Sequence, residues 1–310
     1  MSPETNVARF FSFRKRATLP QREALAAYGF ISPWFVGFII FTAGPMIASI
    51  VLSFTEYDVI NAPEFLGFDN YVKLFEDPRL RLSLWNSFIY TILHVPLSLA
   101  FALGLALLLN QVGKAAGFFR TVFYLPSITP AVAIGRLLLW LLNPHIGLVN
   151  RLLEFLGMSG PGWTTDPNWI KPGLVLMSLW SVGSTVIIYL AALRGVPEPL
   201  YDAAKIDGAN TWQQFRHVTL PMISGAIFFT LIVNTIGSLQ IFREVYTMFF
   251  GQMVSVAGSS AALFYVIYLF RQAFEFLHMG YASAMAWLLF VLILILTFIQ
   301  IKGSNRWVYY

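Results

Sequence analysis

Six long apolar stretches constrain the fold of this chain more than any other feature. A helix needs roughly 20 apolar residues to cross a bilayer core of about 30 Å, and each stretch is long enough. They run approximately over 29–54, 85–109, 118–142, 172–193, 222–250 and 279–301. With 57% hydrophobic and 11% charged residues, the chain has the composition of a polytopic membrane protein. We therefore predict an all-α integral membrane protein with six transmembrane helices.

The distribution of basic residues predicts the direction in which the spans cross. Lysine and arginine favour short cytoplasmic loops. They are more frequent near both termini, between the second and third spans and in the loop 194–221 than in the opposite loops, where acids are common. The first span is too long for a secretory signal, so we expect it to remain uncleaved. The predicted organisation, with both termini cytoplasmic, is an N-terminal arm over 1–28, a membrane domain over 29–301 and a tail over 302–310.

A further helix is expected between the last two spans. After residue 260, apolar residues recur at helical spacing, at Leu263, Ile267, Phe270, Phe274 and Leu277. Polar residues occupy other positions of the same segment. The pattern favours an amphipathic helix lying at the outer membrane surface.

Most site chemistry is missing from the sequence. There is no cysteine, no GxxxxGK[ST] phosphate loop, no HExxH pair and no GxSxG turn. The histidines His94, His145, His217 and His278 are far apart in the predicted topology, so a metal site is not expected. The basic residues follow the membrane and do not form a soluble basic face, which argues against nucleic acid as a partner. We therefore expect no catalysis, no metal and no cofactor in this chain.

The polar loop 194–221 between the fourth and fifth spans has the pattern of two short helices. Pro199 favours a helix start, and Leu200, Ala203, Ala204 and Asp207 would share one side of this first helix. Gly208 is placed to end it as a C-terminal cap. The small side chains would let another surface approach closely.

A second short helix is predicted directly after the glycine. Asn210 and Gln213 have the spacing of a capping box. The expected apolar stripe consists of Trp212, Phe215 and Val218 or Thr219, and Leu220-Pro221 would close the helix before the next span. A solvated loop that only joins two spans is the alternative. An exposed tryptophan and phenylalanine favour a docking surface for a cytoplasmic partner.

This loop resembles the EAA loop of bacterial ATP-binding-cassette importer permeases. The family pattern is roughly EAAxxDGAxxxxxFxxxxLPxxxP, and the matching residues are Asp202-Ala203-Ala204, Asp207-Gly208-Ala209, Phe215 and Leu220-Pro221. Asp202 replaces the leading glutamate, and Gly225 replaces the last proline. The segments 32–54, 119–130, 147–157 and 280–290 are similar to the carbohydrate-uptake branch, as in maltose, glycerol-3-phosphate and multiple-sugar permeases. The segment 249–260 lacks the Thr-x-Gly-Gly-Pro of many relatives.

The resemblance implies a type I importer fold and several partners. Such a permease pairs with a second permease subunit and with two copies of a cytoplasmic ATPase, which bind ATP and Mg. An extracytoplasmic solute-binding protein delivers the sugar. The EAA loop transmits closure of the ATPases to the permeases, which alternate between inward-facing and outward-facing states in the bacterial plasma membrane.

Polar residues within two spans are candidates for the substrate pathway. Polar groups are expensive in lipid and usually face a cavity or another helix. In similar sugar permeases, the part of the fifth span that contains Asn234 lines the substrate cavity. Our candidates are Asn234, Gly237, Ser238, Gln240, Ile241 and Phe242 in the fifth span and Ser178, Trp180, Gly183 and Ser184 in the fourth. Hydrogen bonding between helices is the alternative. Arg136, Arg243 and Glu244 are candidates for gating or structural charges.

Two other functions are compatible with these patterns. A permease of the same family for glycerol-3-phosphate or another small solute would need cations in the pathway, where only Arg136 and Arg243 are candidates. A standalone membrane channel or enzyme would work without an ATPase, and the polar loop would then be part of its own site. A neutral sugar or oligosaccharide is the preferred substrate class.

Overall fold

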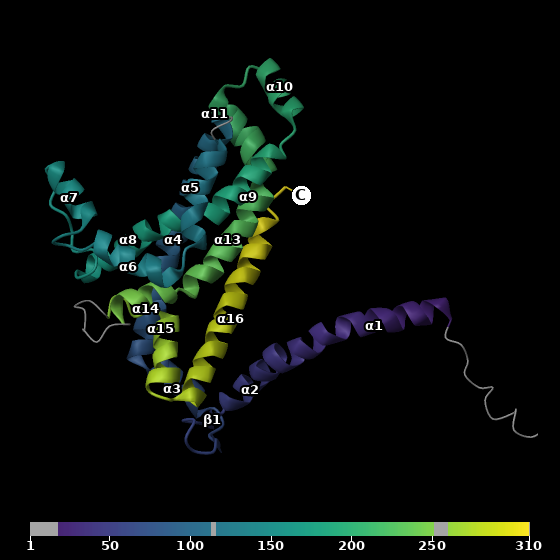
Figure 1. Cartoon of the computed structure of the whole chain (residues 1–310), viewed down its shortest axis with the longest axis vertical. Helices are drawn as coiled ribbons and strands as arrows, with labels where there is room; N and C mark the ends of the chain where they lie inside the picture. The colour runs from purple at the N-terminus through teal and green to yellow at the C-terminus, as the bar shows by residue number, and fades with distance from the viewer. Residues whose placement is uncertain (1–17, 113–115, 251–259, 310) are drawn as a thin grey trace, which may run out of the picture. The chain divides into compact units, whose positions relative to one another are not determined.

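The structure is a computed structural model that describes residues 18–112, 116–250 and 260–309 (Figure 1). It divides into two compact units, residues 1–52 and 53–310, which are considered separately. In the first, α1 (Leu19–Phe38), a π turn η1 (Ile39–Ala43) and α2 (Gly44–Leu52) form one long apolar helix. The helix begins at Leu19, because Thr18 and Gln21 form a capping box there. Its side chains are almost all exposed, as expected of a helix that requires lipid or another chain around it.

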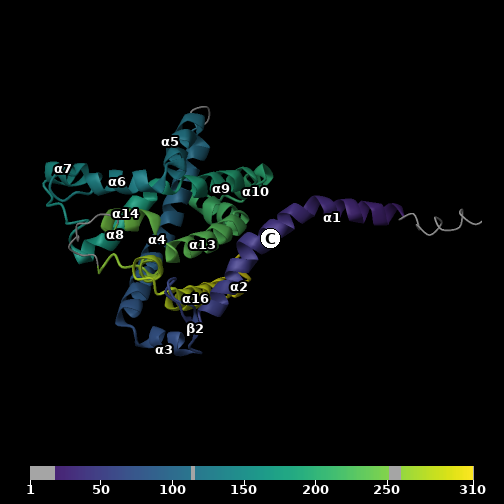
Figure 2. The same ribbon diagram turned by 60° about the horizontal axis from the view of Figure 1, so that its bottom comes forward.

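The second unit is a helical bundle. Its long helices are α4 (Pro78–Gln111), α13 (Ser224–Leu239) and α16 (Met279–Ser304). The shorter elements of the bundle are α5 (Ala116–Ile128), α6 (Ala131–Leu141), α8 (Pro167–Ser178), η3 (Leu179–Ser181), α9 (Gly183–Arg194) and α14 (Arg243–Phe249). α4 packs against α9 and α13, and α13 also contacts α16 (Figure 2).

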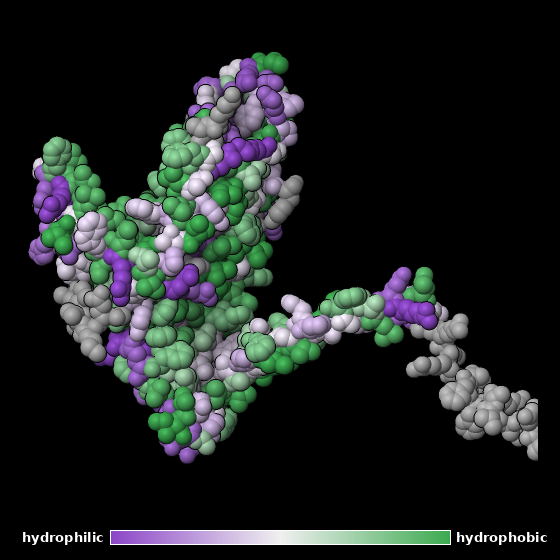
Figure 3. Space-filling model, in the orientation of Figure 1, coloured by the Kyte–Doolittle hydropathy of each residue, from purple (hydrophilic) through white to green (hydrophobic). Residues whose placement is uncertain are grey.

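The connecting segments are also mostly helical. They are α3 (Asp69–Glu76), α7 (Leu148–Phe155), α10 (Glu198–Ile206), α11 (Thr211–Gln214), η4 (Phe215–Thr219), α12 (Leu220–Met222), α15 (Tyr265–Phe270) and η5 (Arg271–Glu275). Two short strands, β1 (Thr55–Glu56) and β2 (Glu64–Phe65), pair antiparallel. On the face shown in Figure 3, hydrophilic side chains gather around α10 and hydrophobic ones lie along α16.

Two of the six predicted spans are bent. The described residues contain four unbroken helices that are long and apolar enough to cross a membrane, or six spans if each bent pair counts as one. α5 and α6 meet at 101°, and α8–η3 meets α9 at 52°. The first bend falls at Thr129 and Pro130, because proline lacks the N–H for the helix ladder and disfavours the helical conformation of the residue before it.

The predicted surface helix after residue 260 is instead part of the core. It does form a helix, α15 followed by η5, but Phe264 and Ile267 are fully buried. The amide of Asn86 on α4 donates to the carbonyls of Ser260 and Leu263, at 3.0 Å each. Ser87 accepts the backbone N–H of Tyr265 at 2.9 Å. The surface prediction was wrong because polar groups from another span satisfy the start of this helix inside the bundle.

Candidate functional site

A cavity of about 230 Å³ lies among α4, α6, α8, α9, α13 and α14. Its polar lining consists of hydroxyl, amide, imidazole and carboxyl groups, and leucine, isoleucine, valine and methionine line the rest. The lining residues are Tyr90, His94, Ile134, Leu138, Leu174, Met177, Ser178, Ser181, Val182, Ser184, Thr185, Asn234, Gly237, Ser238, Ile241 and Glu244. Polar groups converging within an apolar surface are typical of a binding site for a small polar molecule.

A chain of hydrogen bonds orients the polar residues between α4 and α13. The hydroxyl of Ser238 donates to the carbonyl of Asn234 at 2.6 Å, and the amide of Asn234 donates to the carbonyl of Thr230 at 2.8 Å. Nδ1 of His94 lies 2.7 Å from the Ser238 hydroxyl oxygen. A serine hydroxyl has only one hydrogen, so when that hydrogen is directed at the Asn234 carbonyl, Nδ1 of His94 is the donor of the second contact. In the neutral imidazole, Nε2 is then an acceptor, and the Asn234 side-chain oxygen is a second one.

An aromatic pair supports the histidine. The rings of Tyr90 and His94 stack almost parallel, 4° apart in plane, with centroids separated by 5.2 Å. Tyr90 also meets Phe264 edge-on at 5.5 Å. The ring orientation of His94 is thus fixed from one side by packing and at Nδ1 by a hydrogen bond, so its cavity-lining position is set before any ligand binds.

The cavity collects most of the residues that the sequence analysis proposed for the pathway. Six of the candidates are among the residues that line it, namely Asn234, Gly237, Ser238 and Ile241 from the fifth span and Ser178 and Ser184 from the fourth. The bent fourth span and the fifth span therefore share one hollow.

Four candidates lie outside this cavity. Gln240 is exposed beyond the end of α13. Phe242 packs against Phe270, with ring centroids 4.9 Å apart. Trp180 is 53% exposed and borders a different, apolar hollow. Gly183 has a packing role, because a Cβ there would overlap the carbonyl oxygen of Phe123.

Five polar lining residues are not among the pathway candidates from the sequence, although Glu244 is a candidate for a gating charge. They are Tyr90, His94, Ser181, Thr185 and Glu244. Tyr90 and His94 lie four positions apart in the second span and so share a helix face. The rule that polar residues in spans face cavities or other helices would have selected them. The pathway candidates come from the fourth and fifth spans, so they do not include the contribution of α4.

The loop 194–221 forms the predicted helices around the glycine. α10 ends in a Schellman motif, in which the N–H of Ala209 donates to the carbonyl of Ala204 at 2.9 Å and that of Gly208 donates to Lys205 at 3.0 Å. Gly208 has a φ of +78°, which explains the requirement for glycine. Asp202 and Ala203 are exposed on α10, and Asp202 pairs with Lys205 at 3.0 Å.

The second helix of the loop starts at the predicted capping box. The side chain of Asn210 accepts from the Gln213 N–H at 2.9 Å, and the Gln213 side chain accepts from the Asn210 N–H at 2.8 Å. Trp212 is 67% exposed and stacks on Phe215 at 5.4 Å. The helix does not close at Leu220-Pro221 as expected, because Pro221 is tolerated in the first turn of α12.

The two parts of the loop enclose a shallow hollow. It has a volume of about 340 Å³ and includes Ala204 and the glycine of the predicted docking surface, but Ala203 does not line it. It is lined by Ala204, Asp207, Gly208, Ala209, Gln213, His217 and Val218. An open hollow bordered by exposed aromatic and charged side chains can receive a protruding segment of another protein.

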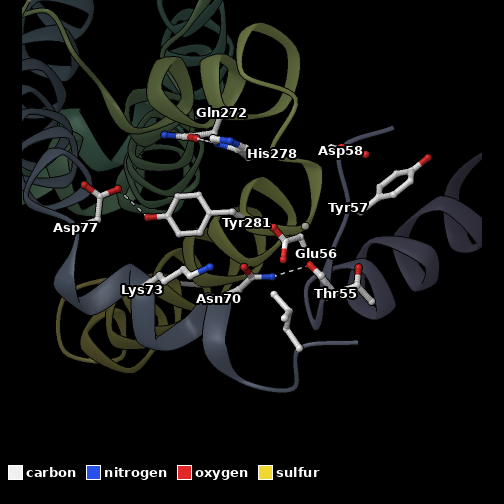
Figure 4. Close-up of a pocket in the computed structure, with 12 residues that line it drawn as sticks. Thr55, Glu56, Tyr57, Asp58, Asn70, Lys73, Asp77, Gln272, His278 and Tyr281 are labelled. Atoms are coloured by element: carbon white, nitrogen blue, oxygen red, sulfur yellow. Dashed lines mark hydrogen bonds between the residues drawn. The ribbon is translucent and has the colours of Figure 1, made fainter. Parts of the chain in front are cut away.

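A second polar cavity, of about 400 Å³, lies where β1, α3, η5 and α16 meet (Figure 4). Asp77 caps α4 there, accepting the N–H groups of Arg79 and Leu80 on one oxygen. Its other oxygen accepts the hydroxyls of Tyr268 and Tyr281, each at 2.7 Å. Burial, and to a smaller extent the hydrogen bond to Asp77, raises the pKa of Tyr268 to about 12. This hydroxyl therefore remains a donor at neutral pH.

Comparison with known proteins identifies the family. Residues 83–307 match the family described as "Binding-protein-dependent transport system inner membrane component". The chain belongs to this family. It is 39% identical over 299 residues to the probable ABC transporter permease protein YesP of Bacillus subtilis, covering 96% of each chain. It is 32% identical to the lactose transport system permease protein LacF of Rhizobium radiobacter, covering 94% of this chain and 98% of that protein.

A solved structure shares the fold of this permease. The crystal structure of a bacterial ABC transporter involved in the import of the acidic polysaccharide alginate contains a chain that matches with a TM-score of 0.79 at 25% identity. The match covers 92% of this chain and 96% of that chain. The predicted all-α type I importer permease fold and the resemblance to carbohydrate-uptake permeases are therefore confirmed.

Proposed function

We propose that this permease is a subunit of an ATP-driven ABC importer and forms half of the translocation pathway for a sugar or oligosaccharide. The observation that carries the proposal is the polar cavity shared by α4, α9 and α13. Its hydroxyl, amide and imidazole groups can exchange hydrogen bonds with sugar hydroxyls. Relatives named for lactose, arabinooligosaccharides and starch degradation products support this substrate class.

The partners follow from the same proposal. A second permease subunit supplies the other half of the pathway. Trp180 and Gln240 of this chain are exposed and can contribute to the pathway between the two subunits. An extracytoplasmic solute-binding protein delivers the sugar, and two copies of an ABC ATPase bind ATP and Mg. A solved alginate transporter crystallised with a substrate-bound periplasmic protein has this fold, which supports such an arrangement.

The loop 194–221 is the proposed contact with the ATPase. Both termini and this loop lie in the cytoplasm, in agreement with the distribution of basic residues. α10 and the hollow beside Gly208 receive the ATPase surface, with Trp212 and Phe215 at the border. Closure of the ATPases on ATP then moves α10, and through α12 and α13 it moves the wall of the cavity.

The test is reconstitution. The chain is expressed with its partner permease, ATPase and binding protein, purified through a tag on this chain and inserted into vesicles. We expect the ATPase and second permease to co-purify and sugar uptake to require ATP hydrolysis. Uptake by this chain alone, without ATP, would contradict the proposal and favour a standalone channel. Glycerol-3-phosphate is less well supported as substrate, because no lysine or arginine is among the described residues that line the cavity.

A further inference from the structure

The pathway cavity contains a single carboxyl side chain, and no lysine or arginine, among the described residues that line it. This acid is Glu244, in the first turn of α14, and it is partly buried. Within the part of the chain that the structure describes, the ion pairs are Lys205 with Asp202 and Arg271 with Glu275. The carboxylate of Glu244 is therefore not neutralised by a salt bridge there.

The nearest basic residues along the packed elements do not enter the cavity. Arg243 precedes Glu244 on α14, and Arg136 lies on α6, which packs against α14. Both are exposed, and neither lines the cavity. The other polar lining groups are hydroxyls, such as those of Tyr90 and Ser178, the amide of Asn234 and the imidazole of His94, and none of them carries negative charge at neutral pH. The carboxylate thus determines the sign of the charge that a substrate meets.

On the basis of the proposed function, we propose that Glu244 makes the pathway selective against anionic sugars, so that the permease takes neutral or amino-substituted glycans. A carboxylate accepts hydrogen bonds from sugar hydroxyls. A uronate, sulfonate or phosphate group would instead meet a like charge. At about 6 Å and an effective dielectric constant near 20, that repulsion lowers affinity about a hundredfold.

The fold alone does not dictate this selectivity. The solved transporter involved in the import of the acidic polysaccharide alginate has the same fold. Charge selection must therefore come from side chains in the cavity, and Glu244 is the side chain placed to provide it here. A carboxylate in the pathway excludes one substrate class while leaving the helices unchanged.

The absence of cysteine from the chain gives a direct test. Ser184→Cys places one thiol in the cavity lining, where Ser184 is exposed. Its labelling rates with a cationic and an anionic methanethiosulfonate of similar size are compared in the full chain in detergent. We expect the cation to react faster, and Glu244→Gln to lower the cation-to-anion rate ratio about tenfold. Glu244→Asp keeps the charge and should keep the ratio.

A second reporter controls for indirect effects. Asn305→Cys lies at the end of α16, near the start of α13. Glu244 follows the other end of α13, so the two positions are separated by the length of this helix, about 24 Å for its 16 residues. Its rate ratio should not respond to Glu244→Gln. An unchanged ratio at Ser184→Cys would overturn the proposal. So would equal uptake of galacturonate and galactose oligosaccharides of one length by the assembled importer, a result that leaves ATP-driven import itself intact.

Discussion

Tyr281 donates its hydroxyl hydrogen to the carboxylate of Asp77 at 2.7 Å, although 204 positions separate the two residues in the sequence. Tyr268 donates to the same oxygen. The first turn of α4 is therefore tied to α15 and to α16, and Asp77 and Tyr281 also line the second polar cavity (Figure 4). Because α4 also carries Tyr90 and His94, this contact connects the start of α4 with the first polar cavity.

Replacement of Asp77 should destabilise the bundle. In Asp77→Asn, the side-chain oxygen can still cap α4, but the amide cannot accept the two tyrosine hydroxyls. Each buried hydroxyl left without an acceptor costs about 1–3 kcal/mol. Thermal unfolding in detergent should show a lower midpoint than wild type. Glu76→Gln, at an exposed neighbouring site, is the control and should unfold like wild type.

The same contact predicts a loss of stability in acid. Burial raises the pKa of Asp77, but the hydrogen bonds from Tyr268, Tyr281, Leu80 and Arg79 outweigh it, so the pKa lies below its usual 3.8. A carboxyl group with a lowered folded-state pKa stabilises fully above its unfolded pKa, about 3.9. That stabilisation is lost as the pH falls through the folded-state pKa. The difference in unfolding midpoint between wild type and Asp77→Asn should therefore shrink below about pH 4; a constant difference would rule out this titration.

Gly208 provides a test of the docking loop through backbone conformation. No atom lies within 4 Å of a Cβ built there, so the constraint is the φ of +78°. That conformation costs an ordinary L-residue about 1–2 kcal/mol, and asparagine adopts it more readily. Gly208→Val should loosen association with the ATPase and lower stimulated ATP hydrolysis, whereas Gly208→Asn should retain most of both. Wild-type association and ATP hydrolysis in both variants would mean that the loop is only a linker.

Gly183 should be intolerant of even one methyl group. Its Cβ would overlap the backbone of Phe123, so Gly183→Ala must separate α9 from α5. Such overpacking typically costs about 1–3 kcal/mol. Gly104→Ala is the matched control, because Gly104 lies inside α4 with nothing within 4 Å of its Cβ. Unfolding midpoints should fall for the first variant and stay equal or rise for the second.

Asn234 should contribute directly to uptake. Asn234→Leu removes an amide from the cavity, and the loss of one hydrogen bond to a sugar costs about 0.5–1.5 kcal/mol, or about two- to tenfold in affinity. The Michaelis constant for uptake in reconstituted vesicles should rise accordingly. Val233→Leu is the control, because Val233 is 49% exposed on the adjacent face. If Asn234→Leu keeps wild-type uptake kinetics, α13 does not select the substrate.

The helices of the loop were predictable because their determinants are local. Pro199, Gly208 and the Asn210–Gln213 capping box each act within a few residues, and the structure places helix starts and stops at these positions. The six apolar stretches were also predictable, because the length and apolar composition of a span are local properties of the sequence. The bend at Pro130 had a local signal as well, since proline breaks helices.

The cavity was only partly predictable because it depends on contacts between spans. Polarity identified Asn234 and Ser238, but nothing local pairs Ser238 with His94, which lies 144 positions away. Sequence alone cannot distinguish a glycine beside a cavity from one beside a neighbouring backbone, and Gly183 lies against the backbone of Phe123. Burial of Ile267 likewise depends on Asn86 and Ser87 in α4.

The π turn η4 determines which direction the docking loop faces. A π turn contains an extra residue compared with an α turn, and each residue of an α-helix rotates the chain by about 100°. Removing one residue from Phe215–Thr219 would rotate α10 by that angle about the helix axis. α10 would then point in a different direction relative to Leu220 and Pro221. Ordinary linkers tolerate such length changes. Here, the helical phase fixes the direction in which α10 points. Evolution can therefore vary the side chains of the loop far more freely than its length.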